Sequence, residues 1–376
     1  MPSPAPSEKH PLLPRHGKPS NSYVLVIHGG AGTMSRDRST PEQQATYKAA
    51  LAKALQAGYQ VLHDGGEAMD AVVAAVTVME DNPLFNSAKG AVFNVEGKNE
   101  LETSLMLSKP PASHPEIPPT RRGLGLTLLT RARNPSHLVR ALYLAPDLAS
   151  HTFLSGATAE RLGESLGETL VDPSYFFTEH RWREHRRGLG LPEEPLPSHD
   201  ESKPPHDSVP PLDQLPTGTV GAVALDVRGC VAALTSTGGR TNKLVGRVGD
   251  TPLMGGGFWA EEWKAHGWVR TTWNKLRGRK STSAVGVSGT GDGDYFIRQA
   301  TAVTIARRMR YLHEPLKNAA RHVVKDLLRD GGEGGVIALD NFGHVAMPLN
   351  CPGMYRGVIR EDGKPKTAIF SDDVLS

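Results

Sequence analysis

The chain has 376 residues, of which 38% are hydrophobic and 22% charged, and its formal net charge is only +3. This charge is too small to indicate a nucleic-acid partner. The two cysteines, Cys230 and Cys351, cannot build a disulfide framework or a zinc cluster, and no apolar run reaches the ~18 residues of a membrane span.

The first segment, residues 1–22, is rich in proline and polar side chains. It lacks the apolar core of a secretory signal, so we predict a disordered tail and a protein that stays in the cytoplasm. Residues 23–27 form an apolar run that leads into glycines, which predicts a buried strand followed by a tight turn.

Four helices are predicted in the next part of the chain. The step Thr40-Pro41-Glu42-Gln43 combines an N-cap hydroxyl, a proline at the first helical position and a glutamine three residues on, which indicates a helix that runs to about residue 62. Alanine and valine fill residues 68–79, as in a largely buried helix. Shorter helices are expected over residues 135–143 and 156–167, and the basic residues 181–187 are expected at a solvated helix end.

The segment of residues 188–218 differs in composition from its surroundings. Eight of its residues are prolines, with acidic residues and serines between them. Such a segment cannot bury enough apolar surface to offset the entropy that is lost on ordering, so it is predicted to be an extended or disordered linker.

Two strand-turn-strand patterns follow the linker, at residues 221–234 and 335–347, and each predicts a hairpin. A helix is expected over residues 295–310. Between these elements, residues 260–283 hold three of the five tryptophans among basic residues. We interpret this stretch as an insertion, either a surface excursion with a small apolar cluster of its own or a lid or subunit contact near a site.

The step Gly218-Thr219 stands where the linker ends and the first apolar alternation begins. Cleavage there would free a threonine whose own α-amine can serve as its base, because a threonine hydroxyl is too weakly acidic to attack an amide unaided. An N-terminal amine has a pKa of roughly 7.7–8.0, so part of it is neutral near physiological pH. Taken alone, the ordinary interpretation is that Thr219 only opens a strand.

Two clusters of hydroxyl and glycine residues, at residues 235–250 and 288–294, follow this threonine. In their order and spacing, the motifs of the chain resemble the plant-type L-asparaginase and isoaspartyl peptidase family of N-terminal-nucleophile hydrolases. The segments that carry the resemblance, over almost the whole chain, are residues 24–32, 83–86, 218–226, 235–250, 288–294, 334–340 and 353–356.

The resemblance implies an α+β fold, the αββα four-layer sandwich in which two antiparallel sheets lie between helical layers. It also implies autocleavage between Gly218 and Thr219. A single catalytic domain would then comprise an α part at residues 23–187, the linker at residues 188–218, and a β part at residues 219–376 that begins with the nucleophile. Since relatives are dimers of such αβ protomers, a homodimer is expected.

By the same resemblance, Thr219 attacks the side-chain carbonyl of L-asparagine or of an isoaspartyl (β-aspartyl) dipeptide and forms an acyl-enzyme. The resemblance implies that Thr237 hydrogen-bonds the nucleophile, that Asn86 positions it, and that His28 with its glycines underlies it. Thr290 and Gly291 would form the oxyanion hole. Arg247 and Asp250 would hold the substrate's α-carboxylate and α-ammonium, and Gly293 would contact the substrate. These residue types suit the roles, because a guanidinium forks onto a carboxylate and an oxyanion hole needs close donors. A structural alternative remains for each of them, such as a turn glycine, a strand-end hydroxyl or a surface ion pair.

This chemistry requires no cofactor. Residues 79–89 nevertheless resemble a loop that holds a sodium ion through main-chain oxygens, and the matched donors are Met79, Glu80, Asn82, Phe85, Ser87 and Lys89. The chain departs from the family here, because Ser87-Ala88 stands where relatives have Ala-Gly. It departs again at residues 106–109 and 123–126, in parts that support processing and sodium binding.

Two alternatives to this function stay open. A glycosylasparaginase-like amidase is the nearest other enzyme, although such enzymes carry His-Asp before the threonine, where this chain has Thr217-Gly218. From a different class, the chain could be an unprocessed, catalytically silent homologue that binds a partner through its tryptophan-bearing insertion. A fragment that begins at Thr219 would distinguish the enzyme from the scaffold.

Overall fold

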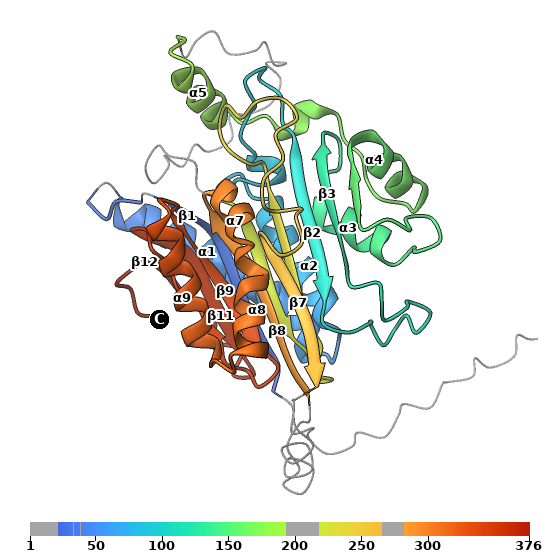
Figure 1. Ribbon diagram of the computed structural model, residues 1–376. Coiled ribbons are helices and arrows are strands. Elements are labelled where there is room, and N and C mark those ends of the chain that lie inside the picture. The colour runs from blue at the N-terminus through green and yellow to red at the C-terminus, as the bar shows by residue number, and fades with distance from the viewer. Residues whose placement is uncertain (1–21, 33, 38, 193–217, 265–281) are drawn as a thin grey trace, which may run out of the picture.

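The computed structural model describes residues 22–32, 34–37, 39–192, 218–264 and 282–376 (Figure 1). The strands of these residues form two sheets. The larger has the order β12-β11-β1-β5-β6-β2-β3-β4 and the smaller the order β10-β9-β8-β7. Neighbouring strands are antiparallel throughout, except that β3 and β4 run parallel.

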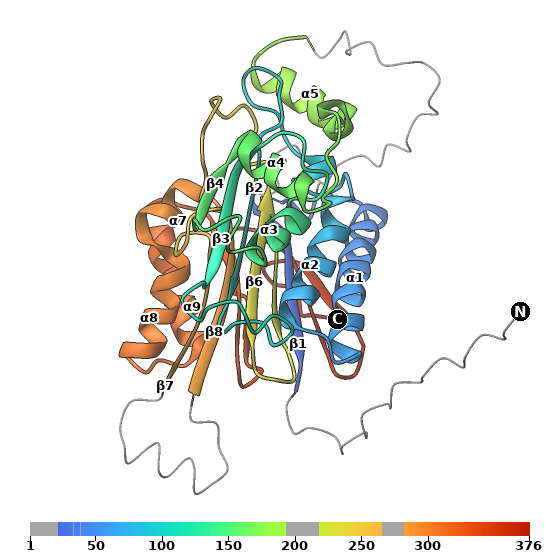
Figure 2. The same ribbon diagram turned by 90° about the vertical axis from the view of Figure 1, so that its right-hand side faces the viewer.

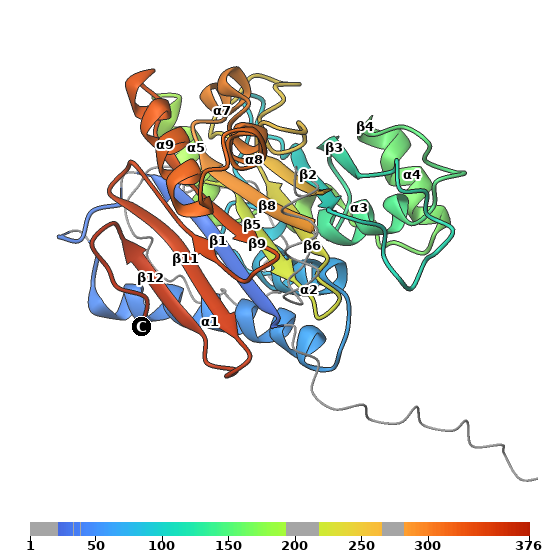
Figure 3. The same cartoon turned by 60° about the horizontal axis from the view of Figure 1, so that its bottom comes forward.

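The strands come from every part of the described chain. Those of the larger sheet are β1 (Val24–Gly32), β2 (Leu101–Leu107), β3 (Gly123–Leu129), β4 (Phe153–Ser155), β5 (Val220–Leu225), β6 (Val231–Thr237), β11 (Gly353–Arg360) and β12 (Lys366–Phe370). Those of the smaller sheet are β7 (Phe258–Lys264), β8 (Thr282–Gly291), β9 (Gly334–Asp340) and β10 (Val345–Ala346). Figure 3 shows β12 and β11 at one edge of the larger sheet and β3 and β4 at the other.

Helices lie on the outer side of each sheet. The described α-helices are α1 (Pro41–His63), α2 (Ala68–Glu80), α3 (Pro135–Tyr143), α4 (Gly156–Ser165), α5 (Glu179–Gly188), α7 (Gly293–Gln299), α8 (Thr301–Tyr311) and α9 (Leu316–Arg329). In Figure 2, α1 and α2 lie on one side of the strands and α8 and α9 on the other. Among the described helices, none combines the length and the apolarity that crossing a bilayer requires.

The side chains of β1 show how the core is layered. Leu25 and Ile27 belong to the apolar cluster beneath α1 and α2, whereas Val24 and Val26 belong to a second cluster that lies between the two sheets. A third cluster packs α8 and α9 against the smaller sheet. Because both faces of β1 are buried, its first four residues, Val24 to Ile27, are all apolar instead of alternating with polar ones. The predicted α+β class is confirmed.

The helices that local signals predicted are confirmed. Thr40 caps α1 with a complete capping box: its hydroxyl accepts from Gln43 N at 3.2 Å, and its own N–H donates to Gln43 Oε1 at 2.9 Å. α2, α3 and α4 lie where they were predicted, with ends that differ by at most two residues. The two predicted hairpins are β5–β6 and β9–β10.

Three local predictions were wrong. The glycines after residue 28 do not form a turn: β1 continues to Gly32 and pairs with β11 across a bulge between His28 and Gly30. The helix predicted at residues 295–310 is two helices, separated at Ala300, which adopts a left-handed φ of 49°. Arg181 is not solvated but buried, with Nε donating to Gly90 O and Nη1 to Glu184.

Most of the predicted tail, linker and insertion lies outside the described residues. Only the ends of the insertion at residues 260–283 are described, and they extend β7 and β8, which pair as far as Lys264 and Thr282. Trp263 at this end is buried in the cluster beneath α8 and α9, so it belongs to the main core and not to a satellite.

Candidate active site

A cavity of about 230 Å³ lies where strand ends of both sheets meet. It is lined by Ala31, Gly32, Glu102, Gly218, Thr219, Thr237, Gly239, Arg240, Arg247, Asp250, Gly291, Asp292, Gly293 and Glu333. The motifs that the sequence analysis singled out therefore converge on one place, although β1 and Glu333 are some 300 residues apart along the chain. Among the residues predicted to act in catalysis or substrate binding, Asn86, Thr290 and His28 do not line the cavity, and neither do the six residues matched to the sodium loop.

Thr219 stands at the inner end of this cavity, at the start of β5, and only 6% of it is exposed. Thr290 lies next to it: its hydroxyl accepts the N–H of Ala31 at 3.1 Å. A side-chain carbon at Gly218 would lie 2.4 Å from Thr290 Oγ1, closer than real atoms approach. A residue with a side chain therefore does not fit before Thr219, which gives a packing reason for the Gly-Thr step.

A chain of three buried side chains holds the main chain of Thr219. His28 Nδ1 lies 2.8 Å from Thr219 O, His28 Nε2 lies 2.7 Å from Ser288 Oγ, and Ser288 Oγ lies 2.8 Å from Thr235 Oγ1. Burial lowers the pKa of His28 to about 3, so the ring is neutral at physiological pH.

The direction of each hydrogen bond in this chain follows from the chemistry of its ends. A carbonyl oxygen can only accept, so the proton of the neutral ring is on Nδ1 and is donated to Thr219 O. Nε2 must then accept from Ser288, which in turn accepts from Thr235. His28 thus acts through Thr219 as a positioning residue, whereas the sequence analysis had predicted only that His28 and the glycines beside it underlie the nucleophile.

We expect His28→Gln to flatten the dependence of stability on pH. The pKa of His28 is about 3 in the folded chain, against an ordinary value of 6.5, so between these limits the unfolded state binds a proton that the folded state excludes. The free energy of unfolding therefore falls as the pH is lowered through this window, and glutamine removes that contribution. Urea unfolding at about pH 7.5 and about pH 5 measures the difference. The exposed His322→Gln is the matched control, and an equal flattening in both variants would contradict the assignment.

Thr237 and Asn86 meet at the turn that follows β6. Thr237 Oγ1 accepts from Gly239 N at 3.0 Å. Asn86 is fully buried beneath this turn. Its side-chain Nδ2 donates to Gly239 O at 2.7 Å, and its main-chain oxygen accepts from Gly238 N at 3.1 Å. Asn86 thus supports the turn that carries Thr237 into the cavity wall, and it does not itself line the cavity.

Arg247 and Asp250 both line the cavity, but they do not form an ion pair with each other. Arg247 Nη2 pairs with Asp294 at 2.9 Å, and its side chain is 19% exposed. Asp250 is buried, and its Oδ2 has no hydrogen-bond partner among the described residues. Burial, with a smaller contribution from Glu102, raises the pKa of Asp250 to about 7. The alternative of a surface ion pair between the two residues is therefore wrong.

The loop that carries Asp250 is fastened by the start of α8. Ala302 N donates to Gly256 O at 3.1 Å and Val303 N donates to Gly255 O at 3.0 Å. The first N–H groups of a helix have no partner within the helix, so the loop carbonyls satisfy them. The left-handed conformation at Ala300 starts α8 at the place where these bonds can form, which explains why one predicted helix is two.

Glu102 is a cavity residue that sequence reasoning missed. It lies on β2, is fully buried, and its Oε1 accepts from Gly249 N at 2.8 Å. The signal that could have revealed it is a single acidic residue within the apolar and hydroxyl-bearing run Leu101–Leu107. Burying a carboxylate costs free energy unless it has a partner or binds a ligand.

The turns that were matched to a sodium loop are compact. Four of the six proposed oxygens, those of Met79, Asn82, Phe85 and Ser87, already accept main-chain hydrogen bonds. The side chain of Glu80 is directed elsewhere, to Ser136 and to Ser236 Oγ, and burial raises its pKa to about 7. Main-chain oxygens are the type of ligand that a hard cation such as sodium prefers, so the matched donors fit sodium by type.

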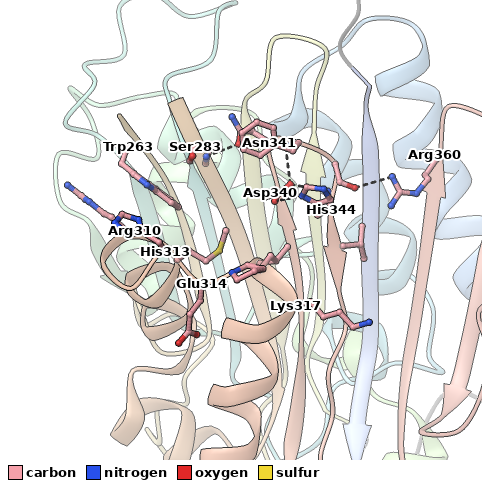
Figure 4. Close-up of a pocket in the computed structure, with 17 residues that line it drawn as sticks. Trp263, Ser283, Arg310, His313, Glu314, Lys317, Asp340, Asn341, His344 and Arg360 are labelled. Carbon is pink, nitrogen blue, oxygen red and sulfur yellow. Dashed lines mark hydrogen bonds and ion pairs between the residues drawn. The ribbon is translucent and has the colours of Figure 1, made fainter. Parts of the chain in front are cut away.

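A larger cavity of about 590 Å³ lies beside α9 and β9 (Figure 4). Its polar groups are largely paired: His344 Nδ1 lies 2.8 Å from Asp340 Oδ2, Arg360 donates to Gly343 O at 3.1 Å, and Glu314 pairs with Arg308. None of the predicted site residues lines it. The smaller cavity is therefore the candidate active site.

Known proteins are similar to this chain over most of its length. A family model described as asparaginase matches residues 21–267 and 278–369. The chain is 35% identical to an isoaspartyl peptidase of Salmonella typhimurium, over 94% of this chain and 100% of the relative, and 36% identical to one of Escherichia coli, over 93% and 96%. It is 30% identical to an isoaspartyl peptidase/L-asparaginase of Xenopus laevis, over 90% and 93%.

Proposed function

Because this chain belongs to the asparaginase family and is a hydrolase, we propose that it cuts itself between Gly218 and Thr219 and then hydrolyses L-asparagine, isoaspartyl dipeptides, or both. One observation carries the proposal: Thr219, Thr237, Arg247, Asp250 and Gly291 line a single cavity. They come from three separate segments of the chain, at residues 218–226, 235–250 and 288–294, and together they supply a nucleophile, donors for an oxyanion and two opposite charges.

Self-cleavage begins when Thr219 Oγ attacks the carbonyl carbon of Gly218. The C–N bond breaks, the nitrogen takes up the hydroxyl proton, and Gly218 is left as an ester on Thr219. Water hydrolyses this ester, which gives a Gly218 carboxylate and a Thr219 with both a free hydroxyl and a free α-amine. The resulting parts are residues 1–218, with the linker at residues 188–218, and residues 219–376.

In turnover, the α-amine of Thr219 takes the hydroxyl proton as Oγ attacks the substrate's side-chain carbonyl. Thr290 and the N–H of Gly291 are assigned to the developing oxyanion, where one such donor typically contributes ~100–1000-fold in rate. The leaving ammonia or amine carries away the proton, and water then hydrolyses the aspartyl ester. Arg247 and Asp250 are assigned to the α-carboxylate and the α-ammonium, and Gly293 to a main-chain contact.

The proposal also covers the fold type, the oligomeric state, the cellular location and a sodium site. The two sheets and their outer helices are assigned to the αββα sandwich of N-terminal-nucleophile hydrolases. A homodimer of αβ protomers, a cytoplasmic location and a structural sodium ion at residues 79–89 are likewise kept as proposals.

We expect purified protein to consist of two chains, the smaller of which begins with Thr219. A denaturing gel with intact-mass measurement and N-terminal sequencing checks this, and release of ammonia and of free amino acids from the two substrate classes checks turnover. Full activity in an uncut chain would overturn the mechanism. An uncut chain without activity would support the silent scaffold instead.

A further inference from the structure

The carboxylate of Glu102 has one oxygen that the protein itself does not use. Oε1 accepts the N–H of Gly249 at 2.8 Å, but Oε2 is buried and has no hydrogen-bond partner among the described residues. Glu102 lines the candidate active site. A buried carboxylate oxygen without a partner has lost its hydration and gained nothing in return, so such an oxygen at a cavity wall points to a ligand.

Glu102 and Asp250 lie on two sides of the Arg247 guanidinium. A side-chain carbon at Gly249 would lie 2.8 Å from Arg247 Nη1 and 3.0 Å from Glu102 Oε2. One at Gly293 would lie 3.3 Å from Arg247 Nη2 and 2.4 Å from Asp250 Oδ1. The two glycines thus leave open the space around which the guanidinium and both carboxylates gather.

Asp250 repeats the pattern of Glu102, because its Oδ2 is also buried without a partner. The cavity wall therefore presents two unpaired carboxylate oxygens beside one guanidinium. A guanidinium takes a carboxylate, and two carboxylates take a compact cation with several donors, such as an ammonium group.

We propose that Glu102 is a specificity-determining residue, whose Oε2 joins Asp250 Oδ2 in a two-carboxylate subsite for the α-ammonium group of the substrate. This inference rests on the proposed function, to which it adds the second carboxylate. It means that the site selects ligands with a free α-amine more strongly than a single carboxylate would.

Binding of an ammonium group in this subsite is coupled to the loss of a proton from the carboxyl pair. Burial raises the pKa of Glu102 as well as that of Asp250, which reaches about 7, so below this pH the free enzyme holds a proton there. An ammonium ligand needs both carboxylates ionised, so its affinity rises as the pH increases through about 7. Lys243 and Arg247 lower the pKa of Glu102, and Glu100 raises it. Arg247 also lowers the pKa of Asp250, and Asp294 raises it. The other charged residues of the cavity wall are Arg240, Asp292 and Glu333.

Calorimetric titration with L-aspartate and with succinate, which lacks the amine, tests the subsite. For Glu102→Gln we expect L-aspartate to bind about 10–100-fold more weakly, with succinate unchanged or tighter. Glutamine still accepts from Gly249 N, so the fold should persist. The pH midpoint of L-aspartate binding should also shift downward, because the charge that raises the pKa of Asp250 is gone.

Glu100→Gln is the matched control. Glu100 is two residues away on the same segment and has the same side chain, but it accepts from Gly246 N and does not line the cavity. Its variant should bind both ligands within about threefold of the wild type. If Glu102→Gln does not fold, Glu102→Asp is the second variant. It keeps the carboxylate but shortens the side chain by one methylene, so it should also weaken the binding of L-aspartate and not that of succinate.

Equal weakening of L-aspartate and succinate would overturn the inference, because it would mean that Glu102 only positions Arg247. No change for either ligand, or wild-type protein that binds neither, would overturn it too. The proposed function fails separately: wild-type protein that stays uncut and hydrolyses nothing refutes it, while the comparison of the two ligands still decides the role of Glu102.

Discussion

Replacing Thr219 with alanine is expected to leave one uncut chain of 40.5 kDa that hydrolyses neither substrate class. The same hydroxyl is assigned to the attack on Gly218 and to the attack on the substrate, so its removal should abolish both events. Turnover should fall by at least about 10⁴-fold, as expected when a nucleophile is lost. Intact-mass measurement follows the cleavage, and ammonia release from L-asparagine follows the turnover.

Thr219→Ser provides the control for this experiment, because it keeps the hydroxyl and removes only a methyl group. It should still cut itself and retain part of the activity, while the fold of both variants is checked by thermal unfolding. Two chains in the alanine variant, or wild-type turnover by it, would show that another group is the nucleophile.

The second large effect is expected for Arg247→Lys. Lysine keeps the positive charge but cannot fork onto a carboxylate with two parallel hydrogen bonds, so the substrate's α-carboxylate loses its geometry as well as one bond. We expect kcat/KM to fall by about 100-fold or more, mainly through KM, because the contact exists before and during the reaction. Self-cleavage should proceed, since it involves no substrate carboxylate.

Arg298→Lys is a suitable control, because Arg298 lies on the same helix as Gly293 but is exposed and outside the cavity. Its kcat/KM should stay within about twofold of the wild type. A change in kcat alone for Arg247→Lys would place Arg247 near the reacting carbonyl and not at the α-carboxylate.

The predictions from local signals succeeded where the signal and the structure involve the same few residues. The capping box at Thr40 and Gln43 is complete within four residues, and it set the start of α1 correctly. The alternating runs on either side of Gly229 and Gly343 likewise produced the predicted hairpins, because a tight turn pairs its own neighbours.

Predictions failed where distant contacts overrule local preference. The glycine-rich residues 29–32 look like a turn, but pairing with β11 keeps them in a strand. β2 was not recognised as a strand, since Glu102, Thr103 and Ser104 interrupt its apolar pattern. Two of these side chains have polar partners across the fold: Thr103 donates to Thr235 O at 3.0 Å, and Glu102 accepts from Gly249 N at 2.8 Å.

The sequence by itself determined the family, the Gly218-Thr219 step and the residues proposed to act on the substrate, because motif order and residue type are properties of the chain alone. Three features became visible in the folded chain alone: Asn86 supports a turn outside the cavity, His28 holds Thr219 through a neutral ring, and Glu102 lines the same cavity as Asp250. The reason is physical. Burial, hydrogen-bond direction and a shifted pKa arise from residues that folding brings together across as many as 260 positions of sequence, and no local pattern encodes them.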